Sequence, residues 1–208
     1  MSQRRVAIAV DRQVSLEARL DLPAQAGGAA LILHPHPLFG GSMDNNVVQA
    51  LAGACAEAGW ASLRINFRGV GRSTGHHDQG LGEQDDVLAA AAWLAGEVPG
   101  PLVLMGYSFG SLMGAKAAAR VAGLAGGLWV SPPYTLGDLP PWPVNSGPLL
   151  VITGDNDEYG NLPRLQAYIQ AMGALGTLNL HQGGDHFWWE GLSALKRQAV
   201  DFLAALNG

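Results

Sequence analysis

The residues best suited to chemistry lie in the segment Gly106-Tyr107-Ser108-Phe109-Gly110, which matches the pattern G-x-S-x-G. The apolar run PLVLMG leads into this segment and an Ala-rich helical pattern follows it, which is the context in which the pattern forms a sharp strand-to-helix turn. Such a turn strains the serine backbone and leaves no room for a side chain at Gly106 or Gly110. It also directs the free N–H groups of the new helix at whatever Ser108 attacks. The segment therefore predicts a nucleophilic serine.

A serine hydroxyl needs a general base, and in this motif class the partners follow in the order serine, acid, histidine. Only His181 and His186 come after Ser108 in the chain. His181 lies inside the strand-like run TLNLHQ, whereas His186 lies in the Gly-rich loop GGDHFWWE. That loop is expected at the carboxyl edge of the sheet, where open α/β sheets place their sites. We therefore expect His186 to be the base.

The acid that orients the base is expected just after the strand LLVITG, where four polar residues follow in the order Asp, Asn, Asp, Glu. Asp157 is preferred because three residues past Gly154 leave room to curl over the sheet towards His186. Asp155 is the alternative, and carboxylates at such a place can also simply cap a turn. Asp185, next to His186, is expected to brace the loop.

Acyl transfer also requires hydrogen-bond donors for the oxyanion. One donor is the N–H of Phe109, directly after the nucleophile, and the other is expected from the loop HPHPLFGG at 34–41. The two prolines of this loop have no N–H, so His36 and Leu38 carry the nearest donors. His36 is preferred, and the prolines stiffen the loop that holds it.

Two alternatives, a metal site and a phosphate loop, fit these segments poorly. His36 could form a metal site with His76 and His77, but no Cys or carboxylate lies at ligand spacing, and a His-x-His flanked by prolines chelates poorly. The stretch 69–75, GVGRSTG, resembles a phosphate loop but lacks both G-x-G-x-x-G and the lysine of a P-loop. We therefore predict no metal and no cofactor.

The elements that must position these residues alternate along the chain. Two strand-like segments at the start, 5–10 and 14–22, suit an antiparallel pair. Continuous apolar runs then mark strands buried on both faces of a parallel sheet. Further strands are expected at 29–34, 60–67, 101–106, 124–130, 147–154 and 177–182, and helices at 44–58, 81–96, 109–122, 161–172 and 190–206. The first of these helices is capped by Asp44 and Asn45 and closed by Gly59. The alternation predicts a mostly parallel, doubly wound α/β sheet.

Composition narrows the class of protein. Of 208 residues 29 are charged, or 14%, against about 25% in an average domain, and 29 are Gly, about twice the usual frequency. Neither disorder nor a coiled coil fits this composition. The net charge of −5, with no basic cluster larger than Arg4-Arg5, predicts no nucleic-acid partner. The chain shows no signal-peptide or membrane-spanning run. With the lone Cys55 read as a buried hydrophobe, we expect one domain over 1–208 in the cytoplasm.

The chain resembles the α/β-hydrolase superfamily, and more narrowly its small, capless bacterial serine hydrolases of the dienelactone hydrolase-like and esterase-like kind. The segments that carry the resemblance are HPHPLFGGSMDNNVV, LRINFRGVGRSTG, GYSFGS, ITGDNDE and GGDHFWW. They follow the family's order and cover nearly the whole chain. The resemblance implies the α/β-hydrolase fold, a triad of Ser108, Asp157 and His186, and an oxyanion pair of His36 and Phe109. Because dienelactone hydrolases proper use Cys as nucleophile, Ser108 does not imply their activity.

The family often inserts a lid after the sixth strand, and here the matching segment, 131–146, is too short for a helical cap. The site is therefore expected to be open or covered by a Pro-rich flap. Aromatic and apolar residues near the predicted edge are candidates for the substrate pocket, with ordinary packing as the alternative. These candidates are Leu38, Tyr107, Tyr134, Trp142 and Trp188, together with Trp189.

Taken together, the sequence predicts a serine hydrolase that cleaves carboxylic esters of small or medium substrates through an acyl-enzyme. A thioesterase or small peptidase would use the same residues. From a different class, a binding protein could keep this fold and lack turnover.

Overall fold

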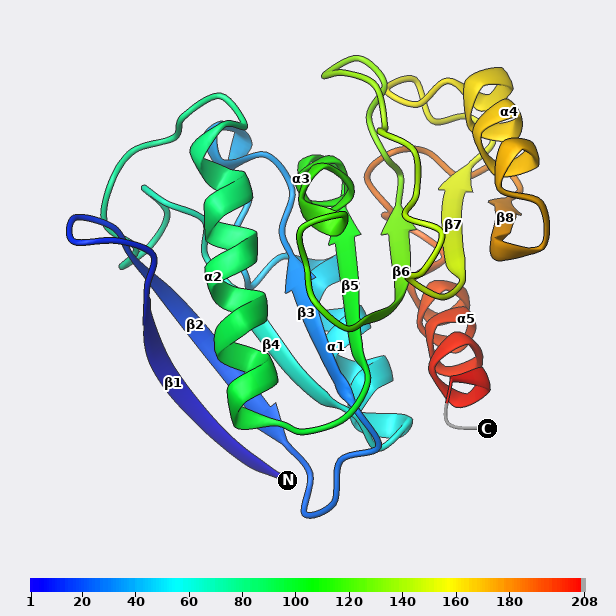
Figure 1. Cartoon of the computed structure of the whole chain (residues 1–208). Coiled ribbons are helices and arrows are strands. Elements are labelled where there is room, and N and C mark those ends of the chain that lie inside the picture. The colour runs from blue at the N-terminus through cyan, green and yellow to red at the C-terminus, as the bar shows by residue number, and fades with distance from the viewer. Residues whose placement is uncertain (207–208) are drawn as a thin grey trace.

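The computed structural model describes residues 1–206, which form an eight-stranded sheet with helices on both faces (Figure 1). Neighbouring strands follow the order β1-β2-β4-β3-β5-β6-β7-β8. The strands are β1 (Ser2–Ala9), β2 (Ser15–Leu22), β3 (Ala29–Leu33), β4 (Ala61–Ile65), β5 (Leu102–Tyr107), β6 (Leu124–Val130), β7 (Leu149–Gly154) and β8 (Gly176–His181). This order places β3 and β5, which lead into the two motifs richest in candidate residues, side by side at the centre.

The strand directions confirm a mostly parallel sheet that begins with an antiparallel pair. β1 runs antiparallel to β2 along its whole length, and β2 is also antiparallel to β4. Every later pair, from β3–β4 to β7–β8, is parallel. The carboxyl ends of β3, β5, β7 and β8 therefore meet at one edge of the sheet, where the predicted site residues follow them.

Within the described residues the α-helices form two layers. α1 and α5 pack against each other on one face, and α2, α3 and α4 cover the other (Figure 1). Their bounds are α1 (Asn46–Glu57), α2 (Gly82–Glu97), α3 (Phe109–Ala118), α4 (Leu162–Met172) and α5 (Leu192–Ala205). As expected, the side chain of Asn45 caps α1 and Gly59, with φ of 73°, closes it.

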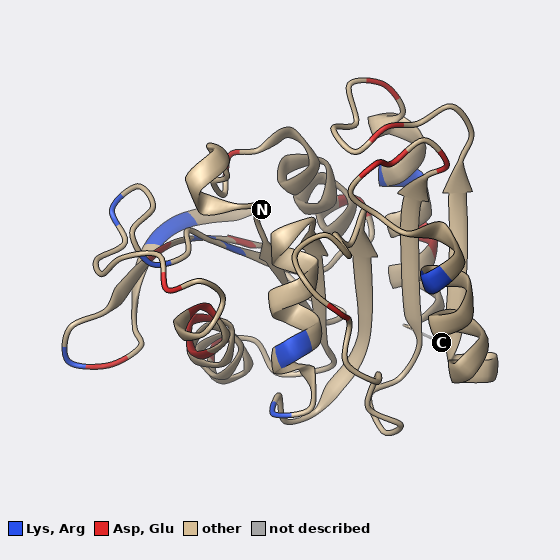
Figure 2. Cartoon of the chain, turned by 90° about the horizontal axis from the view of Figure 1, so that it is seen from above, with Lys and Arg blue, Asp and Glu red and all other residues tan. Residues whose placement is uncertain are grey.

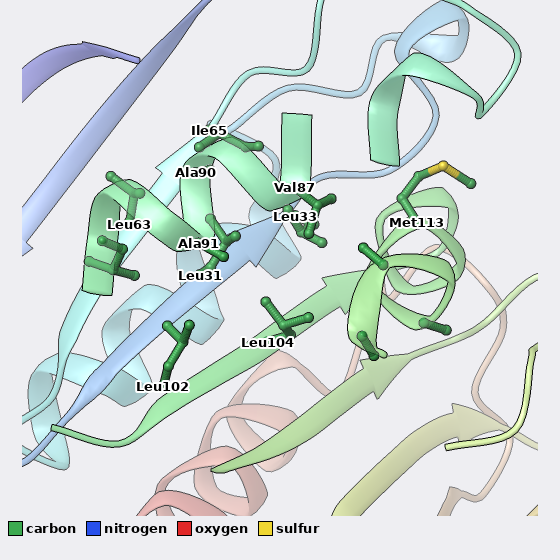
Figure 3. Close-up of a cluster of buried hydrophobic side chains, with 14 of the residues drawn as sticks. Leu31, Leu33, Leu63, Ile65, Val87, Ala90, Ala91, Leu102, Leu104 and Met113 are labelled. Carbon is green, nitrogen blue, oxygen red and sulfur yellow. The ribbon is translucent and has the colours of Figure 1, made fainter. Parts of the chain in front are cut away.

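The larger of two buried clusters fills the space between the sheet and the α2–α3 layer. Figure 3 shows strand side chains of β3, β4 and β5 directed at small and branched side chains of these helices. The labelled members are Leu31, Leu33, Leu63, Ile65, Leu102, Leu104, Val87, Ala90, Ala91 and Met113. The alanines let α2 approach the sheet closely, so the apolar strand runs are covered without gaps.

Burial separates the central strands from the edges. Every residue of β3, β4 and β5 is buried, as expected for strands covered on both faces, whereas β1 is mostly exposed and β8 is mixed. Cys55 lies on the buried face of α1, in the second cluster, and burial raises the pKa of its thiol to about 12. The prediction that Cys55 is a buried hydrophobe is confirmed.

Two details differ from the sequence expectation, whereas the connection after β6 agrees with it. The helix expected over 109–122 ends at Ala118, and the chain then closes in tight turns in which Arg120 N and Val121 N bond to the carbonyls three residues back. Two short 3-10 helices, η1 (Pro37–Phe39) and η2 (Gly173–Leu175), were not expected. Residues 131–146 connect β6 to β7 without a helix or strand, so no cap covers this edge.

Charged side chains are sparse and lie on separate elements. Figure 2 shows Lys and Arg distributed over strands, loops and helices with no single patch. No helix among residues 1–206 is long and apolar enough to cross a membrane.

Candidate active site

Ser108 sits on the turn between β5 and α3, with φ of 51° and ψ of −119°. Positive φ is costly for a residue with a side chain and persists only where the surroundings impose it. Two close backbone contacts impose it here. A Cβ on Gly106 would lie 2.5 Å from the N of Ser111, and one on Gly110 would lie 2.4 Å from the O of Leu33. The strained serine between two obligatory glycines is the elbow predicted from the sequence.

The structure brings Ser108, His186 and Asp157 together. Oγ of Ser108 lies 2.9 Å from Nε2 of His186, and Nδ1 of His186 lies 2.8 Å from Oδ1 and 3.0 Å from Oδ2 of Asp157. A carboxylate can only accept, so Nδ1 carries the ring proton and the lone pair of Nε2 faces the serine hydroxyl. All three side chains are nearly or fully buried. This geometry suits proton transfer from the hydroxyl to the ring.

Asp157 is held as a carboxylate. Burial alone would raise its pKa, but hydrogen bonding and the charge of His186, with further bonds such as that from Gly160 N, outweigh burial and lower the pKa below its ordinary value. Its oxygens also accept from Thr153 Oγ1 at 3.2 Å and from Tyr159 N at 3.0 Å. The group is thus ionised at neutral pH and fixed in position.

The two other aspartates near the site have different partners. Oδ1 of Asp155 accepts from the N–H of Gly183 at 2.7 Å. Oδ1 of Asp185 accepts from the N–H groups of Phe187 and Trp188 at 2.9 and 3.1 Å. Both carboxylates therefore brace the loop that carries His186, which is the role expected of Asp185.

The backbone N–H groups of His36 and Phe109 are candidate donors for an oxyanion. Within residues 1–206, neither His36 N nor Phe109 N has a hydrogen-bond acceptor. The other candidate, Leu38 N, donates to Nδ1 of His36 at 3.2 Å and is therefore occupied. Burial, followed by the nearby His77, lowers the pKa of His36, which keeps the ring neutral and able to accept this bond. The ring of His36 also contacts the ring of Phe109, with centroids 4.9 Å apart.

His34 holds the loop that carries His36. Its ring is fully buried, with Nε2 accepting from Phe67 N at 3.0 Å and Nδ1 lying 2.6 Å from the carbonyl O of Pro35. An amide N–H only donates, so Nε2 is unprotonated and Nδ1–H donates to Pro35. Burial lowers the pKa of His34 to about 4. The neutral ring thus ties the start of the loop to the end of β4, a role that the sequence analysis did not assign.

A cavity of about 610 Å³ opens above Ser108 and His186. Its wall combines residues of the loop 35–41, the elbow, the loop 133–136, and single residues from other loops. Of its fourteen lining residues none is Asp, Glu, Lys or Arg. Besides Ser108 and His186, its polar lining side chains include Asn45, Thr135 and Tyr159, so the wall is mostly apolar and lacks a carboxylate, ammonium or guanidinium group.

Of the candidate pocket residues only Tyr107 lines this cavity. The prediction is wrong for Trp142 and Trp188, which are buried and satisfied: Trp142 donates to the O of Gly147 and Trp188 to Oγ of Ser131. Trp188 also stacks on His181, which confirms His181 as a packing residue of β8.

The remaining candidates lie outside the cavity for other reasons. Leu38 lines a separate, smaller cavity with Arg68 and His76. Tyr134 packs under the guanidinium of Arg164, 4.5 Å from its ring centroid. Trp189 is 78% exposed and not among the lining residues.

Three aromatic residues that the sequence analysis missed line the cavity instead: Phe39, Tyr159 and Phe187. Phe187 directly follows His186, and Tyr159 lies two residues after Asp157. Adjacency to the predicted triad is the signal that could have found both. Phe39 follows His36 by three residues, and its ring contacts the His36 ring at 4.8 Å.

The side chains around His36 do not form a set of metal ligands. The rings of His36 and His77 are near, with centroids 5.0 Å apart, but Nδ1 of His77 lies 2.7 Å from Oε1 of the buried Glu83. Over the described part of the chain no group of three or more His, Cys, Asp or Glu side chains could hold a metal ion.

Comparison with known proteins places this geometry among hydrolases. A family model described as X-Pro dipeptidyl-peptidase (S15 family) matches residues 11–131, which include the loop 34–41 and the elbow. An uncharacterized protein of Rickettsia prowazekii (strain Madrid E) is 31% identical over 191 residues, which is 86% of this chain and 79% of that protein.

Two solved structures cover nearly the whole chain. An α/β serine hydrolase homologue from Coxiella burnetii is 31% identical, with a TM-score of 0.84 over 98% of this chain and 99% of the other. A serine hydrolase without a lid from Xanthomonas campestris is also 31% identical, with a TM-score of 0.80 over 99% of this chain and 92% of the other. The second, described as being without a lid, agrees with an open carboxyl edge.

Proposed function

We propose that this chain, which belongs to the S15 family of the α/β-hydrolase superfamily and has no cap, is a serine hydrolase. Its proposed substrates are carboxylic esters of small or medium size. The observation that carries the proposal is the continuous hydrogen-bonded line from Ser108 through His186 to Asp157. Its link distances of 2.9 and 2.8 Å are those required for nucleophile activation.

In the proposed mechanism Ser108 attacks the ester carbonyl carbon while its hydroxyl proton passes to Nε2 of His186. The N–H groups of His36 and Phe109 donate to the oxyanion that forms. The bond from the carbonyl carbon to the leaving oxygen then breaks, and His186 returns the proton to that oxygen. Water attacks the acyl-enzyme by the same route, releasing the acid and restoring Ser108. Asp157 keeps Nδ1 protonated throughout.

The uncharged cavity favours an ester over the two alternatives that would use the same triad. A peptidase that releases dipeptides from an amino terminus must accommodate a protonated α-amino group, and a coenzyme A thioesterase must accommodate phosphates. Charged ligand groups are normally matched by an opposite charge. None of the lining residues is acidic or basic apart from the histidines. A neutral ester requires no such partner.

The proposal is tested by hydrolysis of a short-chain nitrophenyl ester. We expect turnover by the native protein and a loss of at least about 10⁴-fold in Ser108→Ala, because the nucleophile and its base act as one unit. Ser193→Ala, an exposed serine at the start of α5, is the matched control and keeps native turnover. Native turnover in Ser108→Ala contradicts the site, and absence of turnover in the native protein, with ester, thioester and peptide substrates alike, favours a binding protein.

A further inference from the structure

We propose that Tyr159 and Phe187 form the subsite for the leaving alcohol, and that this subsite prefers an aromatic alcohol. The inference rests on the acyl transfer proposed above. It concerns which half of the ester meets which wall of the cavity, and it follows from the position of the general base.

The leaving oxygen must come within hydrogen-bond reach of Nε2 of His186, because that atom returns the proton as the bond to the carbonyl carbon breaks. The oxyanion points elsewhere, towards the N–H groups of His36 and Phe109. Whatever is attached to the leaving oxygen is therefore held beside the His186 ring. The side chains that flank this ring on the cavity side define the leaving-group subsite.

Three aromatic rings contact His186, and two of them face the cavity with exposed area. The centroid of Tyr159 lies 4.5 Å from that of His186, and the centroid of Phe187 lies 5.6 Å away. Tyr159 is 43% and Phe187 47% exposed, and both line the cavity. The third ring, Tyr107, is buried and its hydroxyl donates to the O of His186, so it forms the floor of the subsite.

The backbone that carries each exposed ring is fixed by a nearby carboxylate, and the two rings pack against each other. Tyr159 N donates to Oδ1 of Asp157 at 3.0 Å, and Phe187 N donates to Oδ1 of Asp185 at 2.9 Å. Their centroids are 6.0 Å apart with planes at 84°, an edge-to-face pair. Rings that are already ordered lose little entropy when a ligand ring packs against them.

This arrangement suits a flat aromatic group better than a saturated one of equal size. A ligand ring can stack on one member of a perpendicular pair while it offers its edge to the other. Such aromatic contacts contribute beyond the area they bury, which corresponds to a preference of about 2- to 10-fold. On the opposite wall Phe39 packs against His36, which carries one of the proposed oxyanion donors. This wall would contact the acyl group of the ester.

The experiment compares benzyl butyrate with cyclohexylmethyl butyrate, each rate divided by the hydroxide-catalysed rate of the same ester. Both give the same butyryl-enzyme, so deacylation is identical and kcat/KM differs only through the leaving group. We expect the native protein to favour the benzyl ester by about 2- to 10-fold. Tyr159→Leu and Phe187→Leu should each move this ratio towards one.

Phe39→Leu is the matched control, since Phe39 is an exposed aromatic residue that lines the same cavity from the other side. It should change both rates alike and keep the ratio. A native ratio near one, or a ratio unchanged in both Tyr159→Leu and Phe187→Leu, overturns the subsite while leaving the hydrolase function intact. Loss of hydrolysis of every ester in the native protein instead contradicts the proposed function itself.

A second measurement uses the native protein alone. Butyryl-enzyme formed from a nitrophenyl ester can be captured by an added alcohol, which must bind where the leaving alcohol departs. Benzyl alcohol should capture the acyl group about 2- to 10-fold more often than cyclohexylmethanol at equal concentration. Equal capture contradicts the aromatic preference.

Discussion

The nucleophile elbow, residues 106–110, and the histidine loop, residues 182–191 between β8 and α5, each hold a strained backbone in place, but they do so by different contacts. Each contains a residue with a side chain in the left-handed region: Ser108 with φ of 51° and Trp188 with φ of 57°. In the elbow the backbone conformation is imposed by close backbone contacts at Gly106 and Gly110. In the histidine loop it is imposed by side chains.

The side-chain bonds of the histidine loop come from within the loop and from two neighbouring segments. Asp185 accepts from two N–H groups within the loop, and Asp155 accepts from that of Gly183 after crossing from the end of β7. The indole of Trp188 donates to Ser131 after β6. The difference teaches that close backbone contacts alone fix the elbow, whereas the histidine loop also depends on side-chain hydrogen-bond acceptors.

The largest expected effect comes from a substitution that changes the hydrogen bond between His186 and Asp157. Asp157→Asn should lower kcat/KM by on the order of 10³- to 10⁴-fold, because an amide at this position favours the wrong tautomer of His186. Asp155→Asn is the matched control, since its side-chain oxygen can still accept from Gly183, and it should retain most activity. Steady-state kinetics on a nitrophenyl ester check both. A greater loss from Asp155→Asn than from Asp157→Asn contradicts the assignment of the acid.

The next largest effect tests the steric claim for the elbow. Gly110→Ala places a Cβ 2.4 Å from a backbone carbonyl that cannot move freely, so we expect about 1–3 kcal/mol of destabilisation and about 100-fold less activity from the displaced nucleophile. The control is Gly96→Ala, in α2 with nothing near its new Cβ, which should stabilise the protein by about 0.5–1 kcal/mol. Urea unfolding measures both. Equal stability of the two variants would show that the elbow tolerates a side chain.

His34, which anchors the oxyanion loop against which Gly110 packs, gives the third effect. Its pKa is lowered from 6.5 to about 4, so the unfolded chain binds a proton that the folded protein does not. Stability is therefore full above about pH 6.5 and falls as the pH drops to about 4. Near pH 5 the expected loss is about 2 kcal/mol.

The test is the difference in urea midpoint between about pH 7.5 and pH 5, taken in the native protein and in His34→Gln. Comparing each protein with itself removes the direct cost of the substitution. His34→Gln should show a smaller drop, because glutamine does not titrate. The same drop in both proteins contradicts the buried, neutral assignment.

The smallest effect concerns the brace within the histidine loop. Asp185→Ala removes the acceptor of two N–H groups, so we expect a loss of about 1 kcal/mol in stability and a modest, roughly 10-fold loss in kcat/KM. Asp185→Asn keeps an oxygen at the same place and should stay close to native in both. If Asp185→Asn is as damaged as Asp185→Ala, the brace depends on charge and not on the acceptor.

The sequence was most informative where geometry is local. The elbow could be predicted because glycine spacing around Ser108 has a direct steric meaning, and the buried strands because continuous apolar runs fit only the middle of a covered sheet. The order of serine, acid and histidine, with the rule that sites lie at the carboxyl edge, was enough to select His186 over His181 and to prefer Asp157 over Asp155. Those residues are the ones that the structure brings together.

Prediction failed where the direction of a side chain depends on a strained backbone. Of the three aromatic residues that follow His186, Trp188 and Trp189 were expected at the pocket. The positive φ of Trp188 turns it into the core, and Phe187 is the one at the cavity. No periodic pattern reveals such a reversal. The end of α3 at Ala118 was missed for a related reason, since the Ala-rich run continues beyond the last residue that packs on the sheet.

The central claim, that Ser108 is the activated nucleophile of this site, is tested most directly by reaction with a fluorophosphonate followed by mass spectrometry of the peptides. The account predicts one phosphonyl group per chain, located on Ser108, with none in Ser108→Ala and much slower labelling in His186→Ala. Labelling at another residue, or equal labelling of Ser108→Ala, would contradict it.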